Sequence, residues 1–138
     1  MTKRFEIIEH TADIGIAAYG SDLKKAFANA AYALFSLMVD LKGVSDTICR
    51  EVEVTAENQE DLLVAWLNEL LYLFEVDNVL FRRFTVGELS ETRLRSRCYG
   101  EAIDPMRHKI KMGVKAATYH MLKIEKGNGF RVQVLFDI

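Results

Sequence analysis

The chain has 138 residues, of which 50% are hydrophobic and 28% charged, and its net charge is −2. A chain of this length builds one domain with its own core, so we expect a single domain over residues 1–138 and exclude a disordered protein. Two cysteines and the lack of any apolar run of about 18 residues exclude a disulfide scaffold and a membrane helix, and they favour a cytoplasmic protein.

The first half of the chain predicts short strands and two helices. Alternating apolar residues indicate strands, and apolar residues at helical spacing indicate helices; in chain order these are strands 5–9 and 14–19, helix 22–39, strand 51–55 and helix 59–76. Ser21 is the expected N-cap of the first helix and Asn58 that of the second, because both side chains accept hydrogen bonds from a helix start.

The second half predicts only strands, which cover 79–87, 92–104, 110–118, 119–126 and 130–137. A run of strands after two helices, without regular strand–helix alternation, indicates an α+β fold. We therefore expect a mainly antiparallel β-sheet with two amphipathic helices packed on one of its faces.

The last two predicted strands flank Gly127-Asn128-Gly129, a loop of the length that closes a hairpin. A three-residue loop sets the apolar residues of both strands on one face and opposite charges across from each other on the other face. A slip of one residue would reverse this arrangement. The predicted pairs are Glu125–Arg131, Ile124–Val132, Lys123–Gln133, Leu122–Val134, His120–Phe136 and Tyr119–Asp137.

Carboxylates at the end of the chain form a candidate metal site. Asp137 is followed by the terminal carboxylate of Ile138, and two anions so close repel each other unless a cation joins them. If Asp13, in the loop between the first two strands, approaches them, three carboxylates share one pocket. Such all-oxygen ligation suits Ca²⁺, Mg²⁺ or Mn²⁺ rather than zinc. The alternative is that Asp13 only makes a local turn hydrogen bond.

Basic residues gather in the second half, where residues 79–138 hold 12 Lys/Arg and 6 Asp/Glu against 6 and 14 in residues 1–78. Three arginines, Arg93, Arg95 and Arg97, alternate along one predicted strand, and more cations follow over 107–115. No aromatic residues interleave with the arginines, so a solvated or partner-facing strand is favoured over direct RNA reading. The sequence contains no phosphate-binding glycine loop and no metal-ligand histidine spacing.

Several segments together resemble the archease family, the small partner protein of RtcB-type RNA ligases. The segments that carry the resemblance are His10-Thr11-Ala12-Asp13-Ile14, Ala26-Phe27-Ala28-Asn29-Ala30-Ala31, Leu62-Leu63-Val64-Ala65-Trp66-Leu67-Asn68-Glu69-Leu70-Leu71, Tyr99-Gly100-Glu101, His108, Val114-Lys115-Ala116-Ala117-Thr118-Tyr119-His120 and Phe136-Asp137-Ile138. They cover nearly the whole chain in order.

The resemblance implies a protein that is not itself an enzyme. It would promote guanylylation and multiple turnover of an RtcB-type RNA ligase in tRNA splicing, and would broaden the nucleotides that the ligase accepts. Its partners would be the ligase and, through the ligase, RNA, with no membrane and no DNA. Asp13, Asp137 and Ile138 would hold a divalent cation, with Ca²⁺ expected first and Mg²⁺ or Mn²⁺ as alternatives.

A docking patch is expected beside these carboxylates, formed by His10, Lys115 and Tyr119. The hairpin register would set Tyr119 against Asp137, and the two-residue period of a strand would bring Lys115 to the same side. A lysine there could neutralise charge on a polyphosphate, or it could only pair with the carboxylates. Two other functions remain open, a stand-alone metal-dependent phosphohydrolase and an RNA-binding chaperone.

Overall fold

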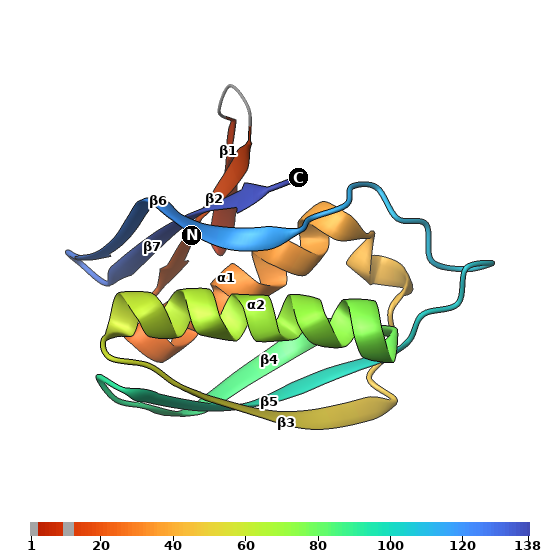
Figure 1. Ribbon diagram of the computed structural model, residues 1–138, viewed down its shortest axis with the longest axis horizontal. Coiled ribbons are helices and arrows are strands. Elements are labelled where there is room, and N and C mark those ends of the chain that lie inside the picture. Colours follow the sequence, from red (N-terminus) through yellow and green to blue (C-terminus); the bar gives the residue numbers. More distant parts are fainter. Residues whose placement is uncertain (1–2, 10–12) are drawn as a thin grey trace.

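Two antiparallel sheets enclose two helices in the computed structural model, which describes residues 3–9 and 13–138 (Figure 1). The elements are β1 (Phe5–Glu9), β2 (Ile14–Gly20), α1 (Leu23–Met38), a short 3₁₀ turn (Leu41–Gly43), β3 (Ile48–Thr55), α2 (Gln59–Asp77), β4 (Val79–Leu89), β5 (Arg93–Ala102), β6 (Ala116–Lys126) and β7 (Phe130–Asp137). The predicted α+β class is confirmed. The single sheet is corrected to two, one on each side of the helices.

The four-stranded sheet has the order β1-β2-β7-β6, so the first and last parts of the chain are neighbours at its centre. Ile14 of β2 lies opposite Phe136 of β7, and the ladder continues to Gly20 opposite Phe130. Apolar residues of these strands, such as Ile16, Val134 and Phe136, are buried against the helices. This burial fixes which side chains face outward.

The three-stranded sheet has the order β3-β5-β4 and closes the other side of the helices. Gly100 of β5 lies against β4, where a Cβ atom would come within 1.7 Å of the Leu80 carbonyl oxygen. Glycine is therefore required there because the two main chains approach so closely. A bulge in β4 between Phe81 and Arg83 accompanies this contact.

The helices supply most of the core. Trp66 of α2 is fully buried, and its indole N–H donates to Ser96 Oγ at 3.0 Å, which in turn donates to the Val52 carbonyl. The Asn58 side chain accepts from the Asp61 N–H at 2.8 Å, so the predicted N-cap of α2 is confirmed. For α1, Asp22 and not Ser21 caps the helix, since the Asp22 carboxylate accepts from the Lys25 N–H.

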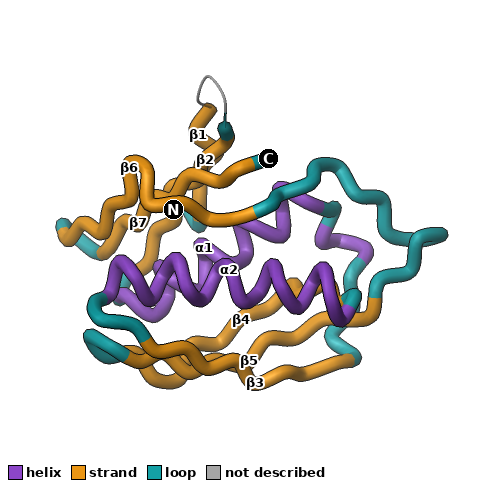
Figure 2. The backbone as a smooth tube through the Cα atoms, viewed as in Figure 1, coloured by secondary structure: helices purple, strands orange, loops and turns teal. Residues whose placement is uncertain are grey.

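The predicted strand 110–118 is largely wrong, since residues 103–115 form a long loop that projects from the body of the protein (Figure 2). The loop is held to the protein at a few points. Ile110 makes an isolated bridge to Val39, and the Lys111 N–H donates to the Met38 carbonyl at 2.7 Å. Neither helix in the described part of the chain is both long and apolar enough to cross a membrane.

The β6–β7 hairpin follows the predicted register only near its loop. Lys123 lies opposite Gln133 as expected, but beyond a bulge Thr118 lies opposite Leu135 and Ala116 opposite Asp137. Met121, within the bulge, has φ 55°, and its carbonyl accepts from the Gln133 side chain at 2.9 Å. The pairs Tyr119–Asp137 and His120–Phe136 are therefore wrong, and His120 is exposed rather than buried.

The bulge has a physical cause in α2. The Asn68 side chain accepts from the Ala117 N–H at 2.7 Å and donates to the Ala117 carbonyl at 3.3 Å. These bonds fix Ala117 on the helix side of the sheet, where it is buried. The strand must then take up extra residues before it reaches the hairpin loop, and it does so at 119–122.

Candidate functional site

Asp13 and Asp137 lie side by side at one end of the four-stranded sheet. Ile14 and Phe136 form the last pair of the β2–β7 ladder, so the next residues outward are Asp13 and Asp137. Side chains alternate along a strand, and Phe136 points into the core, so Asp137 projects from the opposite face. The ladder thus sets two residues that are 124 positions apart in the sequence at the same end of neighbouring strands.

Lys115 and Ile138 complete this end of the sheet. The Lys115 N–H donates to the Asp137 carbonyl at 2.8 Å, which brings the end of the loop 103–115 to the main chain of Asp137. Ile138 follows Asp137 and is about half exposed. This main-chain contact arises through the loop and not through the predicted strand face, so a place for the Lys115 ammonium beside the carboxylates stays a prediction.

The donor set at this end fits a hard cation. Carboxylate and main-chain oxygens are the ligands that Ca²⁺, Mg²⁺ and Mn²⁺ prefer, and the site has two carboxylates with Ile138 oxygens beside them. Within residues 3–9 and 13–138, no group of three or more His, Cys, Asp or Glu side chains converges. A cation here would therefore depend on main-chain oxygens as well as on Asp13 and Asp137.

Tyr119, one of the predicted patch residues, does not lie opposite Asp137. Tyr119 lies beyond Ala116 along β6, in the bulge, and burial together with the carboxylate of Asp61 at the start of α2 raises its pKa. Its side chain is 60% exposed, so it remains available to a partner, but next to α2. His10 lies outside the described residues.

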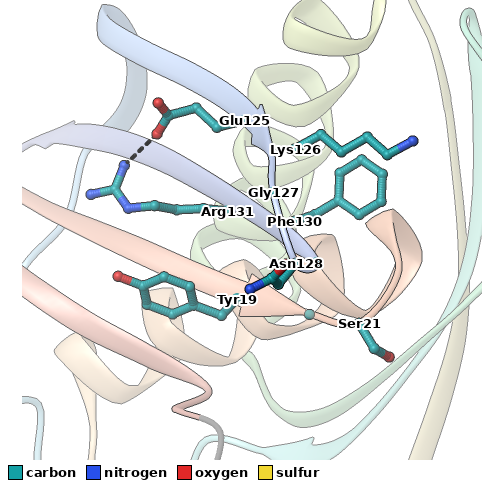
Figure 3. A pocket seen from close by; sticks show the side chains of 10 residues that line it. Tyr19, Ser21, Glu125, Lys126, Gly127, Asn128, Phe130 and Arg131 are labelled. Atoms are coloured by element: carbon teal, nitrogen blue, oxygen red, sulfur yellow. Dashed lines mark hydrogen bonds and ion pairs between the residues drawn. The ribbon is translucent and has the colours of Figure 1, made fainter.

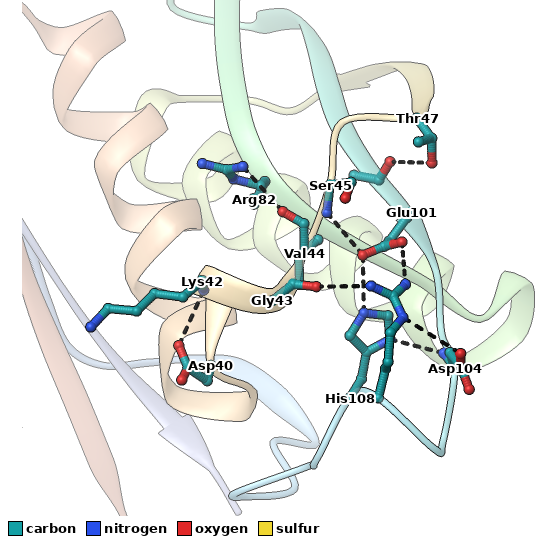
Figure 4. Close-up of polar contacts among 12 residues, drawn as sticks. Asp40, Lys42, Gly43, Val44, Ser45, Thr47, Arg82, Glu101, Asp104 and His108 are labelled. Carbon is teal, nitrogen blue, oxygen red and sulfur yellow. Dashed lines mark hydrogen bonds and ion pairs between the residues drawn. The ribbon is translucent and has the colours of Figure 1, made fainter.

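A buried polar cluster around Glu101 was not predicted from the sequence (Figure 4). Glu101 at the end of β5 accepts hydrogen bonds from the Ser45 N–H at 2.8 Å and from Arg107, and His108 Nε2 lies 3.0 Å from its Oε2. The other ring nitrogen, His108 Nδ1, accepts from the Asp104 N–H at 2.8 Å. Since Nδ1 accepts, Nε2 carries the proton and donates to Glu101.

These contacts set the charge state of the cluster. Burial alone raises the pKa of Glu101, but the hydrogen bonds from Arg107, the Ser45 N–H and His108 outweigh it and lower the pKa to about 2. The Arg107 guanidinium also donates to the Gly43 carbonyl at 3.3 Å. The cluster therefore ties the start of the loop 103–115 to the segment before β3.

The three arginines predicted to share one face of a strand do so on β5, but they are paired with glutamates. Arg93, Arg95 and Arg97 are exposed on β5, and Glu53 lies 2.8 Å from Arg93 and 3.3 Å from Arg95. Arg95 also reaches Glu88, and Arg97 reaches Glu51. Because neighbouring strands neutralise these cations, the face presents little uncompensated positive charge to a polyanion such as RNA.

A cavity of about 540 Å³ opens at the other end of β7, beside the hairpin loop (Figure 3). Its cations are also engaged. Arg131 donates to Glu125 at 3.0 Å and to Gln133 at 3.1 Å, and the Lys126 ammonium lies 6.0 Å from the centre of the Phe130 ring. The cavity contains none of the predicted site residues and is not arranged as a polyphosphate cradle.

These features define a class of protein: a small α+β domain with two helices between two antiparallel sheets, and two aspartates at the end of the ladder that joins β2 to β7. The sequence model described as "Archease protein family (MTH1598/TM1083)" matches residues 5–138. The chain belongs to the archease family.

Similar proteins cover the whole chain. Protein archease of Methanosarcina acetivorans is 44% identical over 99% of this chain and 97% of its own length, and that of Pyrococcus abyssi is 46% identical over 90% and 89%. The solution structure of protein 1598 of Methanobacterium thermoautotrophicum has a TM-score of 0.84 and 36% identity, covering 99% of this chain and 100% of the other.

A crystal structure of an archease of Thermotoga maritima, described as a possible chaperone, has a TM-score of 0.63 and 24% identity, covering 100% of this chain and 98% of the other. At that identity the likeness supports the fold alone.

Proposed function

We propose that this protein is the non-enzymatic cofactor of an RtcB-type RNA ligase, promoting guanylylation and multiple turnover of the ligase in tRNA splicing and broadening the nucleotides it accepts. The observation that carries the proposal is the β2–β7 ladder of an archease-family chain, which ends at Ile14 and Phe136 and makes Asp13 and Asp137 the next residue of each strand. This arrangement supports a carboxylate site at one edge of the sheet, where a second protein could reach it.

In this proposal Asp13, Asp137 and a main-chain oxygen of Ile138 hold a divalent cation, with Ca²⁺ expected first and Mg²⁺ or Mn²⁺ as alternatives. Such a cation, when bound, supplies positive charge that stabilises developing charge on phosphoryl oxygens. The proposal also assigns the Lys115 ammonium to this edge, and the support for it is the hydrogen bond from the Lys115 N–H to the Asp137 carbonyl. A lysine in this place is suited to bind the polyphosphate of a nucleotide at the ligase.

The experiment that tests the proposal is RNA ligation by a purified RtcB-type ligase at substrate excess, with and without this protein. We expect one round of joining without it and many rounds with it, and a faster appearance of the guanylylated ligase. Equal product yields in both reactions would contradict the proposal. Phosphoester cleavage by this protein alone would instead indicate a hydrolase.

Lys115→Ala sharpens this experiment. We expect the variant to fold normally and to bind Ca²⁺ or Mn²⁺ as wild type does, while the rate of ligase guanylylation falls. Lys123→Ala, which removes an exposed lysine from the hairpin end of β6, is the matched control and should activate fully. Normal activation by Lys115→Ala would limit Lys115 to a structural role.

The contribution of Ile138 can be tested separately by extending the chain beyond it. A short tag joined to Ile138 should weaken cation binding, because it removes a carboxylate and crowds the edge of the sheet. The same tag joined to the N-terminus is the control. Equal affinities for the two tagged proteins would exclude the terminal carboxylate as a ligand.

A further inference from the structure

Met106 stands out among the exposed apolar side chains. It is 95% exposed, whereas Tyr119 at 60% and Tyr72 at 56% come next among the large hydrophobic residues that the structure describes. It lies in the loop 103–115, which extends well beyond the helices and sheets (Figures 1 and 2). A single exposed apolar residue is ordinary in itself. The way in which the loop holds Met106 is what distinguishes it.

The turn that carries Met106 is fixed by its own hydrogen bonds. The Asp104 side chain accepts from the Met106 N–H at 3.0 Å, and the Asp104 carbonyl accepts from Arg107 at 2.9 Å and from His108 at 2.7 Å. Pro105 restricts the backbone just before Met106. The apolar side chain is therefore presented from a defined turn, which lowers the entropy lost on binding.

The Glu101 cluster lies beneath this turn and anchors it. His108 and Arg107, which follow Met106 directly, are the two side chains that reach Glu101. Burying a carboxylate is costly unless it is fully paired, and here the pairing serves to hold a loop rather than to join two strands. The chain thus uses a buried charged cluster to position a segment whose tip makes no apolar contact of its own.

The flanks of Met106 are strongly basic. Residues 105–115 contain four Lys/Arg and no Asp/Glu. Arg107 is occupied by Glu101, but Lys109, Lys111 and Lys115 form no ion pair with any residue in the described ranges. The loop therefore combines one apolar tip with uncompensated positive charge, which complements an apolar pocket bordered by carboxylates.

We propose that the loop 103–115 is a docking element, with Met106 inserted into an apolar pocket on a protein partner whose rim carries carboxylates. The inference rests on the proposed function, and it identifies that partner as the RNA ligase. The loop runs without interruption from Met106 to Lys115 and is fastened on the way, by Lys111 to Met38 and by Lys115 to Asp137. Docking of its tip would therefore align the carboxylate edge with the partner.

The chemistry of the tip favours a protein over RNA as the occupant. Residues 103–115 contain no Phe, Tyr or Trp on which a base could stack, and the His108 ring is buried. The one guanidinium, that of Arg107, is engaged by Glu101, Gly43 and Asp104. Methionine is flexible and apolar, and it fills irregular pockets on protein surfaces.

Calorimetric titration of a purified RtcB-type ligase with Met106→Ala tests the inference. Since a central apolar anchor carries much of an interface's affinity, we expect the dissociation constant to rise roughly tenfold. Val76→Ala removes another exposed apolar side chain, on α2, and should leave the dissociation constant unchanged. Lys109→Glu combined with Lys111→Glu should weaken binding further and reduce its dependence on salt.

The outcomes separate this inference from the proposed function. Equal affinities of Met106→Ala and wild type for the ligase overturn the docking element, whether or not the wild type activates the ligase. Binding that depends on Met106 without any activation supports the docking element and overturns the proposed function. If the wild type does not bind the ligase, both fail. If the double lysine variant loses affinity for RNA but binds the ligase as wild type does, the inference of a protein partner is overturned.

Discussion

Two basic regions of this protein use their charge in opposite ways. On β5 the arginines lie opposite glutamates of β3 and β4, so the positive charge is neutralised within the sheet. In the loop 103–115 the lysines have no such partners among the described residues, although the loop is firmly anchored. The difference shows that a count of cations does not locate a binding surface. The surface lies where cations lack an internal partner and the backbone is nevertheless fixed.

The largest expected effect is on the Glu101 cluster, because its charged side chains fix the loop 103–115 to the rest of the protein. Glu101→Gln should lower the free energy of unfolding by about 3 kcal/mol at pH 7, since it removes a buried charge paired by several hydrogen bonds. Urea unfolding of both proteins measures the loss. Equal stabilities at pH 7 would mean that the cluster contributes nothing to the fold.

The difference in stability between wild type and Glu101→Gln should depend on pH. The folded state lowers the pKa of Glu101 from its ordinary 4.5 to about 2, so the carboxylate stabilises the fold fully above pH 4.5. This contribution is lost as the pH falls from 4.5 towards 2. In that interval Glu101 takes up a proton in the unfolded chain but stays ionised in the folded protein, so acid favours the unfolded chain. The difference between wild type and Glu101→Gln should therefore shrink over this interval, and a difference independent of pH would contradict the assignment.

The carboxylate edge provides the next test. Asp13→Ala should reduce the affinity for Ca²⁺ or Mn²⁺ at least tenfold, because one of two acidic ligands is removed, while the fold remains intact. Glu51→Ala, on the outer face of the other sheet, is the control. Calorimetry that finds the same affinity for Asp13→Ala as for wild type would exclude the site.

The bulge of β6 offers a smaller effect. Met121 has φ 55°, which is unfavourable for a residue with a Cβ, and its side chain is nearly half exposed. Met121→Gly should therefore stabilise the protein by about 1 kcal/mol, and Met121→Val should destabilise it. Urea unfolding distinguishes the two. A glycine variant less stable than wild type would show that the methionine side chain contributes more than the backbone costs.

The smallest effect is expected on β5. Arg95→Ala removes an exposed arginine that is paired with Glu53 and Glu88, and exposed ion pairs contribute about 0–1 kcal/mol. We expect a small change in stability and no change in ligase or RNA binding. A large loss of RNA affinity would instead indicate that the arginines of β5 form a nucleic-acid-binding surface although they are paired.

Local patterns in the sequence predicted much of the fold. The helical spacing of Leu62, Trp66 and Leu70 predicted α2, and Asn58 was correctly identified as its cap. The register of the last hairpin was correct near Gly127, where turn geometry decides it. It failed beyond Met121, because the hydrogen bonds of Asn68 to Ala117 are tertiary and leave no periodic signal in the strand.

The sequence connects one pair of acidic residues, whose role as a site stays a prediction, and misses the buried Glu101 cluster. Asp13 and Asp137 were proposed as neighbours, and the β2–β7 ladder supports this because adjacent strands align them. Glu101 and His108 were not connected, although both stand in segments quoted for the archease resemblance. Neither has a spacing that indicates a ligand, since their contact depends on the turn at Asp104.

The pairing of β2 with β7 also bears on how the chain folds during synthesis. β1 and β2 can form a hairpin as soon as they are made, but the other edge of β2 is completed only when residues 130–137 arrive. Contacts between such distant segments form slowly, and an open strand edge can pair with another chain in the meantime. Chains interrupted before residue 130 should therefore aggregate through β2, and refolding should lose yield as protein concentration rises.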